Sequence, residues 1–312
     1  MAAGTPVTRW LQYAAVQAVS ATVGLMPMRT VRRCGRRLGA LAFRVDAFHR
    51  RIALENLRRA FPGKNPGEVS ATARAVFEHF GSLLLELMRF AQLSSEQMQG
   101  LIDTEGEERV WQAYSRGRGV LFFTGHFGYW EMQATTQPLR VKAVSVLARP
   151  LDNPRLHRML EHIRTRTGNT VIYRQGALRK VLRALSENRG VALLIDQHLQ
   201  TDAVQVDFFG RPAATTSALA ALALRTGASV IPVFALPLPD GRYRFVYERP
   251  VDPPPEDSPQ AVQAFTQRCT DVLEMYVRRH PDLWLWMHRR WRDAGPGPAT
   301  GVLPREGADA DV

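Results

Sequence analysis

A histidine and a glutamate five residues apart, His126 and Glu131, are the pair best placed for acid–base chemistry in this chain. An apolar run over residues 120–123 predicts a buried strand, and Gly125 and Gly128 break it on either side of the histidine before a predicted helix. Open α/β sheets place their chemistry at such strand ends. Across the turn, Glu131 can accept a hydrogen bond from one imidazole nitrogen and leave the other free as a base. The alternative is a structural histidine beside a solvated glutamate, which is favourable at a helix start.

A second acid, Asp196, has the same kind of position in the chain. Residues 190–196 form another apolar run, which predicts a buried strand ending in Asp-Gln-His. If the two strands are parallel neighbours, their carboxyl ends meet, and Asp196 could then orient His126 or stabilise its charge. The alternative is an acid in a loop without a role.

Charge and cysteine content narrow the class of protein. The chain of 312 residues carries 41 Lys+Arg against 29 Asp+Glu, a net charge of +12, with a pI near 10.5. This balance indicates a polyanionic partner: nucleic acid, an anionic membrane surface or phosphorylated substrates. The two cysteines, Cys34 and Cys269, are far apart and support neither a disulfide framework nor a metal site, which fits a reducing compartment.

The beginning of the chain predicts membrane association. No charged residue occurs from Trp10 to Met28, and Arg9 and Arg29 bracket this segment. Further arginines follow within residues 32–37, a combination that suits an interfacial anchor on anionic lipid. Polar residues within the segment leave two arrangements open, a helix that spans the bilayer and one that lies flat on it. An ordinary buried helix with a solvated basic neighbour is the alternative.

The remaining elements predict an α/β fold with a central mixed, mostly parallel sheet flanked by helices, and an N-terminal membrane-associating helix. The expected domains are residues 1–40 (the membrane-associating helix and its basic flank), 41–293 (the α/β domain) and 294–312 (a disordered tail). Further strands are predicted at 143–147, 170–173 and 229–236, with 242–248 as the antiparallel partner of the last. Residues 284–292 interleave tryptophan with arginine, which suits a membrane interface or a stacked, charge-paired closing segment.

Several familiar motifs are missing from the sequence. It contains no G-x-S-x-G elbow, Walker A loop, G-x-G-x-x-G, H-E-x-x-H or paired CxxC, so a serine hydrolase, a nucleotide-binding enzyme or a zinc protein has little support. No nucleic-acid-binding module is recognisable either. A histidine base with carboxylate support but without a nucleophile motif indicates direct transfer to a hydroxyl.

The segment His126-Phe-Gly-Tyr-Trp-Glu131 matches the H-x4-D/E motif of glycerolipid-type acyltransferases. The wider pattern, from about Trp10 to Arg292, resembles the bacterial lipid A biosynthesis (lauroyl/myristoyl) acyltransferases of the lysophospholipid acyltransferase superfamily, and the related phosphatidylinositol mannoside acyltransferases. The other similar segments are Glu55–Pro62, Arg149-Pro with Asn153-Pro154, Asp196-Gln-His, Val206–Gly210, Ala214–Thr216 and Trp286–Arg290.

The resemblance implies an enzyme of the bacterial inner (cytoplasmic) membrane with its active site on the cytoplasmic side. Such an enzyme moves a fatty acyl chain from acyl carrier protein or acyl-CoA to a hydroxyl of a lipid A precursor or similar glycolipid. By this analogy His126 is the general base and Glu131 its orienting partner, while Asp196 falls where the mannoside-acylating relatives carry a second acid. The acyl thioester is a co-substrate, and neither a metal nor another cofactor is implied.

The same resemblance assigns three substrate-binding positions. Arg149 and Arg164 match arginines that line the cleft, for the phosphate of the acceptor or for the donor. Asn153 belongs to the similar segment that follows Arg149 and is expected to bind substrate with it.

Alternatives remain at two levels. Within the same chemistry, the acceptor could be a lysophospholipid or a mannosylated inositol lipid. A catalytically silent lipid-binding protein of the same fold is the alternative from another class, and it predicts that His126→Ala leaves function intact. Nucleic-acid binding rests on net charge alone.

Overall fold

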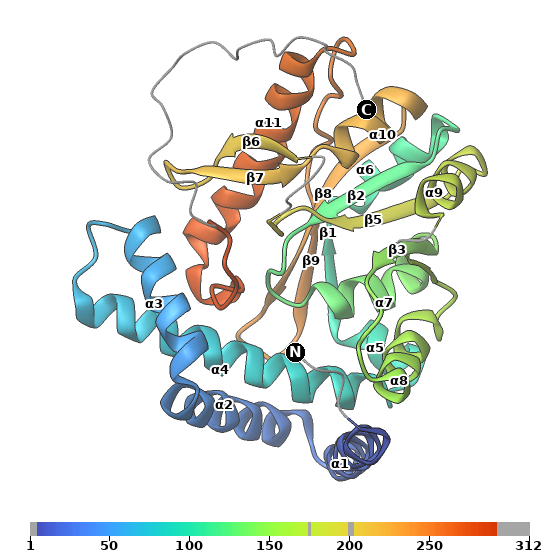
Figure 1. Ribbon diagram of the computed structural model, residues 1–312. Helices are drawn as coiled ribbons and strands as arrows, with labels where there is room; N and C mark the ends of the chain where they lie inside the picture. The colour runs from blue at the N-terminus through green and yellow to red at the C-terminus, as the bar shows by residue number, and fades with distance from the viewer. Residues whose placement is uncertain (1–4, 174–175, 199–202, 292–312) are drawn as a thin grey trace, which may run out of the picture.

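The computed structural model describes residues 5–173, 176–198 and 203–291, and within them the strands form two sheets (Figure 1). The main sheet has seven strands in the order β1-β9-β8-β2-β5-β3-β4, and β6 and β7 form a separate antiparallel pair. The strands are β1 (Ile102–Glu105), β2 (Val120–Thr124), β3 (Val144–Ala148), β4 (Thr170–Tyr173), β5 (Gly190–Leu194), β6 (Ala203–Asp207), β7 (Pro212–Thr216), β8 (Ser229–Pro237) and β9 (Tyr243–Tyr247).

The sheet is mixed and mostly parallel, as the sequence predicts. Strand β2 lies in the middle and pairs in parallel with β5 and β8, while β3 and β4 continue the parallel part. Strand β9 runs antiparallel to β8, which confirms the partner predicted for residues 229–236. The outermost strand β1, which the sequence analysis did not predict, pairs in parallel with β9.

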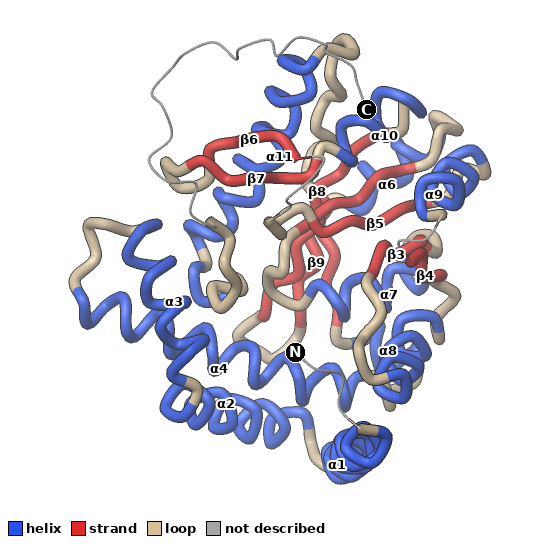
Figure 2. The backbone as a smooth tube through the Cα atoms, in the orientation of Figure 1, coloured by secondary structure: helices blue, strands red, loops and turns tan. Residues whose placement is uncertain are grey.

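Helices cover both faces of the main sheet (Figure 2). They are α1 (Pro6–Gly24), α2 (Met28–Val45), α3 (Ala47–Ala60), α4 (Pro66–Phe90), α5 (Ser95–Gly100), α6 (Glu107–Ser115), α7 (Trp130–Arg140), α8 (Pro154–Thr165), α9 (Ala177–Ser186), α10 (Ala218–Thr226), α11 (Pro259–Arg279) and the 3-10 turn η1 (Pro281–Leu283). Because side chains alternate along β2, Leu121 and Phe123 pack towards α9, α10 and α11, whereas Val120 and Phe122 pack towards α6.

The first two helices pack onto α4 at the base of the molecule in Figure 1. Helix α2 crosses α4 closely through glycines: a Cβ on Gly39 would lie 2.0 Å from the carbonyl oxygen of Phe77, and one on Gly81 would lie 2.4 Å from that of Gly35. The predicted division at residue 40 therefore falls inside a helix that packs against the α/β part. The predicted tail, 294–312, lies outside the described residues.

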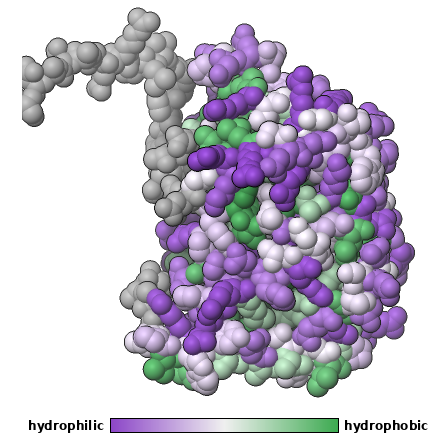
Figure 3. Space-filling view, turned by 90° about the vertical axis from the view of Figure 1, so that its right-hand side faces the viewer, coloured by the Kyte–Doolittle hydropathy of each residue, from purple (hydrophilic) through white to green (hydrophobic). Residues whose placement is uncertain are grey.

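Helices α1 and α2 also carry exposed apolar side chains. On α1 these are Val7, Trp10, Leu11 and Val19, and on α2 they are Leu38, Leu41 and Val45. Figure 3 shows apolar surface along the lower edge, where Figure 1 places α1 and α2. Across the described ranges, no helix combines the length and the apolarity needed to cross a bilayer.

Candidate active site

His126 and Asp196 meet at the carboxyl ends of two neighbouring strands. The parallel register pairs Thr124 of β2 with Leu194 of β5, and each functional residue follows two positions later. The imidazole Nδ1 lies 2.8 Å from Asp196 Oδ1 and donates to it, because a carboxylate only accepts. The backbone N–H of His126 donates to Oδ2 at 2.7 Å. The predicted meeting of the two strand ends is confirmed.

Asp196 is almost fully enclosed, with 1% of its surface exposed. Besides its two bonds from His126, it accepts a hydrogen bond from Trp284 Nε1 at 2.9 Å, also on Oδ2. His288 Nε2 lies 3.2 Å from the backbone carbonyl oxygen of Asp196. The carboxylate is therefore held from several sides and can orient the imidazole ring with little freedom of its own.

The two glycines of the turn are required by close packing. A Cβ on Gly125 would lie 2.9 Å from Asp196 Oδ2, so a side chain there would push the carboxylate away from the histidine. Gly128 has a φ of +57°, and a Cβ on it would lie 1.9 Å from the carbonyl oxygen of Ala235. Glycine thus lets the turn pass between β5 and β8 while keeping His126 beside Asp196.

The surroundings of the two side chains lower the pKa of Asp196 and raise the pKa of His126, so the carboxylate is ionised and the imidazole takes up a proton more readily. Burial alone would raise the pKa of Asp196, but the charge and hydrogen bond of His126 outweigh it, so its pKa falls well below the ordinary 3.8. Burial likewise would lower the pKa of His126, but the charge of Asp196 and its hydrogen bond outweigh it and raise the pKa above 6.5. The other nitrogen, Nε2, lies 3.4 Å from Gln197 Nε2. With Nδ1 tied to Asp196, Nε2 is the nitrogen that can accept a proton from a substrate.

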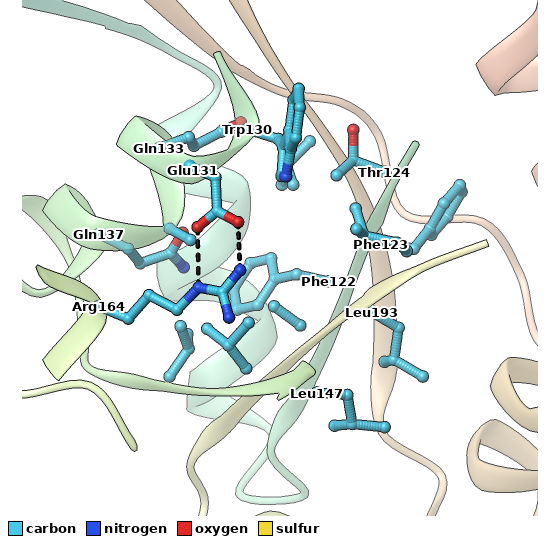
Figure 4. A pocket seen from close by; sticks show the side chains of 16 residues that line it. Phe122, Phe123, Thr124, Trp130, Glu131, Gln133, Gln137, Leu147, Arg164 and Leu193 are labelled. Carbon is cyan, nitrogen blue, oxygen red and sulfur yellow. Dashed lines mark hydrogen bonds and ion pairs between the residues drawn. The ribbon is translucent and has the colours of Figure 1, made fainter. Parts of the chain in front are cut away.

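Glu131 makes a different contact from the one predicted. It lies in the first turn of α7, and its carboxylate forms a two-pronged ion pair with Arg164 of α8, with Arg164 Nε 2.9 Å from Oε2 (Figure 4). Asp196, and not Glu131, accepts the hydrogen bond of the imidazole, so the predicted contact between Glu131 and His126 is corrected. The reason is geometric: the helix carries Glu131 towards α8, whereas strand pairing brings Asp196 to the ring. The negative charge of Glu131 still contributes to the raised pKa of His126.

The other two predicted substrate residues have separate positions. Asn153 is buried and caps α8, accepting from the backbone N–H of Arg155, while its Nδ2 donates to the carbonyl oxygen of Arg9 at 2.8 Å and to Gln12 at 3.1 Å. It therefore fastens α1 to α8, and its expected role in substrate binding stays a prediction. Arg149 is exposed directly after β3, at the same edge of the sheet as His126.

The segment rich in tryptophan and arginine closes the site from the C-terminal side. Trp284, Trp286 and Arg290 are almost fully buried, and the rings of Trp284 and Trp286 pack edge to face, which supports a closing segment. Arg290 donates to the carbonyl oxygen of Ala214 and the hydroxyl of Thr215 instead of the predicted acidic partner. The segment holds the turn that carries His126, because the backbone N–H of Leu285 donates to the carbonyl oxygen of His126 at 3.1 Å. The side chain of Asn56, from α3, donates to the carbonyl oxygens of residues 286 and 288. The sequence analysis did not single out Trp284 as a partner of Asp196, although the composition of the segment pointed to a closing role.

A pocket lies close to the His126–Asp196 pair, between α7 and the sheet (Figure 4). Thr124, two residues before His126, and Trp130, whose ring centroid lies 5.4 Å from that of the imidazole, line it. The Glu131–Arg164 pair also faces it. Most of the remaining lining is apolar: Phe122, Phe123, Ala134, Val144, Val146, Leu147, Ala192, Leu193, Leu194 and Val233.

Metal ligation has no candidate in the part of the chain that the structure describes: no group of three or more His, Cys, Asp or Glu side chains there is arranged to hold an ion. The described site holds an oriented imidazole near a largely apolar pocket. Such an imidazole can remove a proton from a hydroxyl group.

Comparison with known proteins decides the family. The family model described as bacterial lipid A biosynthesis acyltransferase matches residues 2–293. The chain belongs to this family. It is therefore an acyltransferase that uses an acyl donor and a lipid acceptor, and the resemblance seen in the sequence is confirmed.

Relatives of this acyltransferase act on more than one lipid. It is 27% identical to the phosphatidylinositol mannoside acyltransferase of Mycolicibacterium smegmatis over 76% of this chain and 79% of that one. It is 26% identical to the lipid A biosynthesis lauroyltransferase of Escherichia coli K12 over 92% and 93% of the two chains. A 1-acyl-sn-glycerophosphate acyltransferase structure from Thermotoga maritima aligns at 16% identity, covering 78% of this chain and 97% of that one, with a TM-score of 0.37.

Proposed function

We propose that this acyltransferase moves a fatty acyl chain from the thioester of acyl carrier protein or coenzyme A to a hydroxyl of a lipid A precursor or similar glycolipid. The observation that carries the proposal is the hydrogen bond from His126 Nδ1 to buried Asp196, which leaves Nε2, 3.4 Å from the amide nitrogen of Gln197, as the ring nitrogen that can take up a proton near a largely apolar pocket. His126 acts as the general base and Asp196 orients it. No cofactor beyond the acyl thioester is needed.

The reaction follows from this geometry. The acceptor hydroxyl gives its proton to His126 Nε2 as its oxygen attacks the thioester carbonyl carbon. The carbon–sulfur bond then breaks, and the imidazolium returns the proton to the departing sulfur, so the products are an ester and a free thiol. Asp196 stabilises the imidazolium between these steps because its carboxylate stays ionised.

The remaining residues of the site position the substrates. The apolar lining along β2, β3 and β5 suits the acyl chain of the donor. The Glu131–Arg164 pair faces the same space and holds the start of α7 against α8. Arg149, exposed at the edge of the sheet, suits a phosphate group on the acceptor or the donor.

The N-terminal helices support association with the cytoplasmic face of the bacterial inner membrane. The exposed arginines Arg29, Arg33, Arg36 and Arg37 lie on α2, and exposed apolar side chains lie on both α1 and α2, a combination that suits an anionic lipid surface. Association with this surface brings an enzyme of lipid acylation next to an acceptor that resides in the bilayer.

The test is acyl transfer from labelled acyl carrier protein and acyl-CoA to a panel of acceptors: a lipid A precursor, a phosphatidylinositol mannoside and a lysophospholipid. Wild type, His126→Ala and the control His162→Ala, an exposed histidine of α8, are compared in detergent. We expect His126→Ala to lose about 10²–10⁴-fold in kcat, as removal of a general base does, and the control to match wild type. Equal transfer by His126→Ala would refute the assigned base. Lipid binding without transfer to any acceptor would favour the silent lipid-binding protein.

A further inference from the structure

The pocket beside His126 contains buried polar atoms for which the described part of the chain supplies no hydrogen-bond partner. Gln133 and Gln137 lie one turn apart on α7, and only 2% and 3% of their surfaces are exposed. Both amide atoms of Gln133, Nε2 of Gln137 and Oγ1 of Thr124 lack a partner among the described residues, and all three residues line the pocket. Figure 4 shows both glutamines beside the Glu131–Arg164 pair.

Several other buried polar groups of the same helix are paired. Thr135 and Thr136 donate to the carbonyl oxygens of Glu131 and Met132. Pro138 has no N–H to donate to the carbonyl oxygen of Ala134, and the side chain of Asn169 donates to that oxygen instead, at 2.6 Å. Nε of Arg140, at the end of α7, is unpaired among the described residues, although Nη2 of the same guanidinium donates to Thr104 and Glu107. The unpaired amides of this helix are the ones that face the pocket.

Unpaired amides in such a place carry a cost. A buried donor or acceptor without a partner costs about 1–3 kcal/mol, and leucine at either position would line a pocket for a plain hydrocarbon chain without that cost. The amides therefore indicate an occupant that supplies hydrogen-bonding atoms within the pocket. The rest of the lining is mostly apolar, which fits a chain with an isolated oxygen and not a sugar, whose hydroxyls need partners on every side.

We propose that the pocket selects an acyl donor whose chain carries a hydroxyl group, with Gln133 and Gln137 as the residues that recognise it. This inference rests on the proposed function, in which the pocket holds the acyl chain. Gln137 Oε1 lies 3.5 Å from the hydroxyl of Tyr247, so its free Nε2 is the donor to the chain's oxygen. Gln133 has a free amide oxygen that can accept the chain's O–H. Side chains four residues apart on a helix are neighbours, so one hydroxyl can bond to both.

The experiment compares donors of equal chain length, loaded on acyl carrier protein, that are either unsubstituted or hydroxylated at one of a series of positions. We expect one hydroxylated donor to exceed the unsubstituted one about tenfold in kcat/KM with wild type, the ratio that one to two good hydrogen bonds supply. In Gln133→Leu and Gln137→Leu the ratio falls towards one because the unsubstituted chain is used better. Gln112→Leu, an exposed residue of α6, serves as the control and keeps the wild-type ratio.

Two results would overturn the inference. One is a wild-type enzyme that prefers the unsubstituted donor over every hydroxylated one. The other is a preference for a hydroxylated donor that survives both leucine substitutions, which would mean that water pairs with the amides. If a leucine variant fails to fold, methionine, with a similar length, replaces it. Transfer of the unsubstituted chain by wild type and its loss in His126→Ala test the proposed function separately.

Discussion

Two carboxylates are almost completely buried among the residues that the structure describes, and they differ in what their partners can do. Asp196, at the end of β5, holds His126 and Trp284. Glu86, in the middle of α4, has no exposed surface and accepts from Arg32 Nε at 2.8 Å, Ser82 Oγ at 2.5 Å, and the hydroxyls of Tyr129 and Tyr243. Glu86 thus accepts a hydrogen bond at all four of its acceptor sites, and Asp196 accepts three.

The difference lies in whether the residue bonded to the carboxylate has a second nitrogen that can take up a proton. Arg32 is permanently charged, and it also donates to the carbonyl oxygen of Gly241, so Glu86 fastens α2 to α4, to the residue before α7 and to β9. His126 uses only one of its ring nitrogens on Asp196, and the other, which lies 3.4 Å from the amide nitrogen of Gln197, can take up a proton. Burial of a carboxylate alone is therefore no sign of catalysis, whereas a titratable partner with a second, proton-accepting nitrogen is one.

The largest expected effect comes from Asp196→Asn. Loss of the carboxylate removes both the orientation of the imidazole and the charge that stabilises the imidazolium, so we expect kcat to fall by about 10²–10⁴-fold. The measurement is single-turnover acyl transfer at saturating donor. A variant with near-normal kcat would show that the strand-end acid is structural, like Glu86.

The pH profile of the same variant sharpens this result. The base must be neutral to act, and the raised pKa of His126 places the midpoint of the acidic limb of wild-type kcat/KM above 6.5. Asp196→Asn removes the charge that raises this pKa, so the midpoint moves to lower pH. An unchanged midpoint would show that another group controls the limb.

Glu86→Gln is expected to lower stability instead of chemistry. Removal of one partner of a buried ion pair costs about 3–5 kcal/mol, and we expect the lower end because the side chain of Arg32 is 21% exposed and can reach water. Denaturant unfolding measures the loss, and kcat at a temperature where the variant is folded stays close to wild type. The control is Glu78→Gln on the same helix, which breaks a more exposed pair with Arg74 and should cost less than about 1 kcal/mol. Full stability of Glu86→Gln would contradict the fastening role.

Glu131→Gln is expected to have the smallest effect of the three acid substitutions when each effect is expressed as a free energy. The carboxylate positions Arg164 and contacts the imidazole only through its field, so we expect about a tenfold loss in kcat/KM, or 1.4 kcal/mol. Glu108→Gln, an exposed first-turn glutamate of α6, is the control and should leave activity unchanged. A loss as large as that of Asp196→Asn would mean that Glu131 reaches the reacting groups once substrate is bound.

Much of the site could be predicted from local patterns. The apolar run before Gly125 and the helix after Tyr129 placed His126 at a strand end, and the same pattern placed Asp196 at another. Local patterns could not show which of the two acids near the histidine accepts the hydrogen bond of its ring. Glu131 was the closer in sequence, but α7 directs it to Arg164, and only strand pairing shows that Asp196 reaches the ring.

Other residues escaped prediction because their partners are distant in sequence. Asn153 resembled a substrate residue, yet it caps α8 and ties down α1, which begins some 150 residues earlier. Glu86 lies within a helix whose pattern predicts only a core face, and its partners come from three other parts of the chain. Gln133 and Gln137 look like ordinary polar residues of a helix until the sheet buries them.

By itself the sequence determined the alternation of strands and helices, the strand-end positions of His126 and Asp196, the basic N-terminal segment and the family, because these depend on local periodicity and on residue types at short spacing. The tertiary structure alone decided which acid holds the histidine, which acid is structural and which polar side chains face a pocket. These outcomes depend on the register of non-adjacent strands and on contacts between distant segments, which no local pattern specifies.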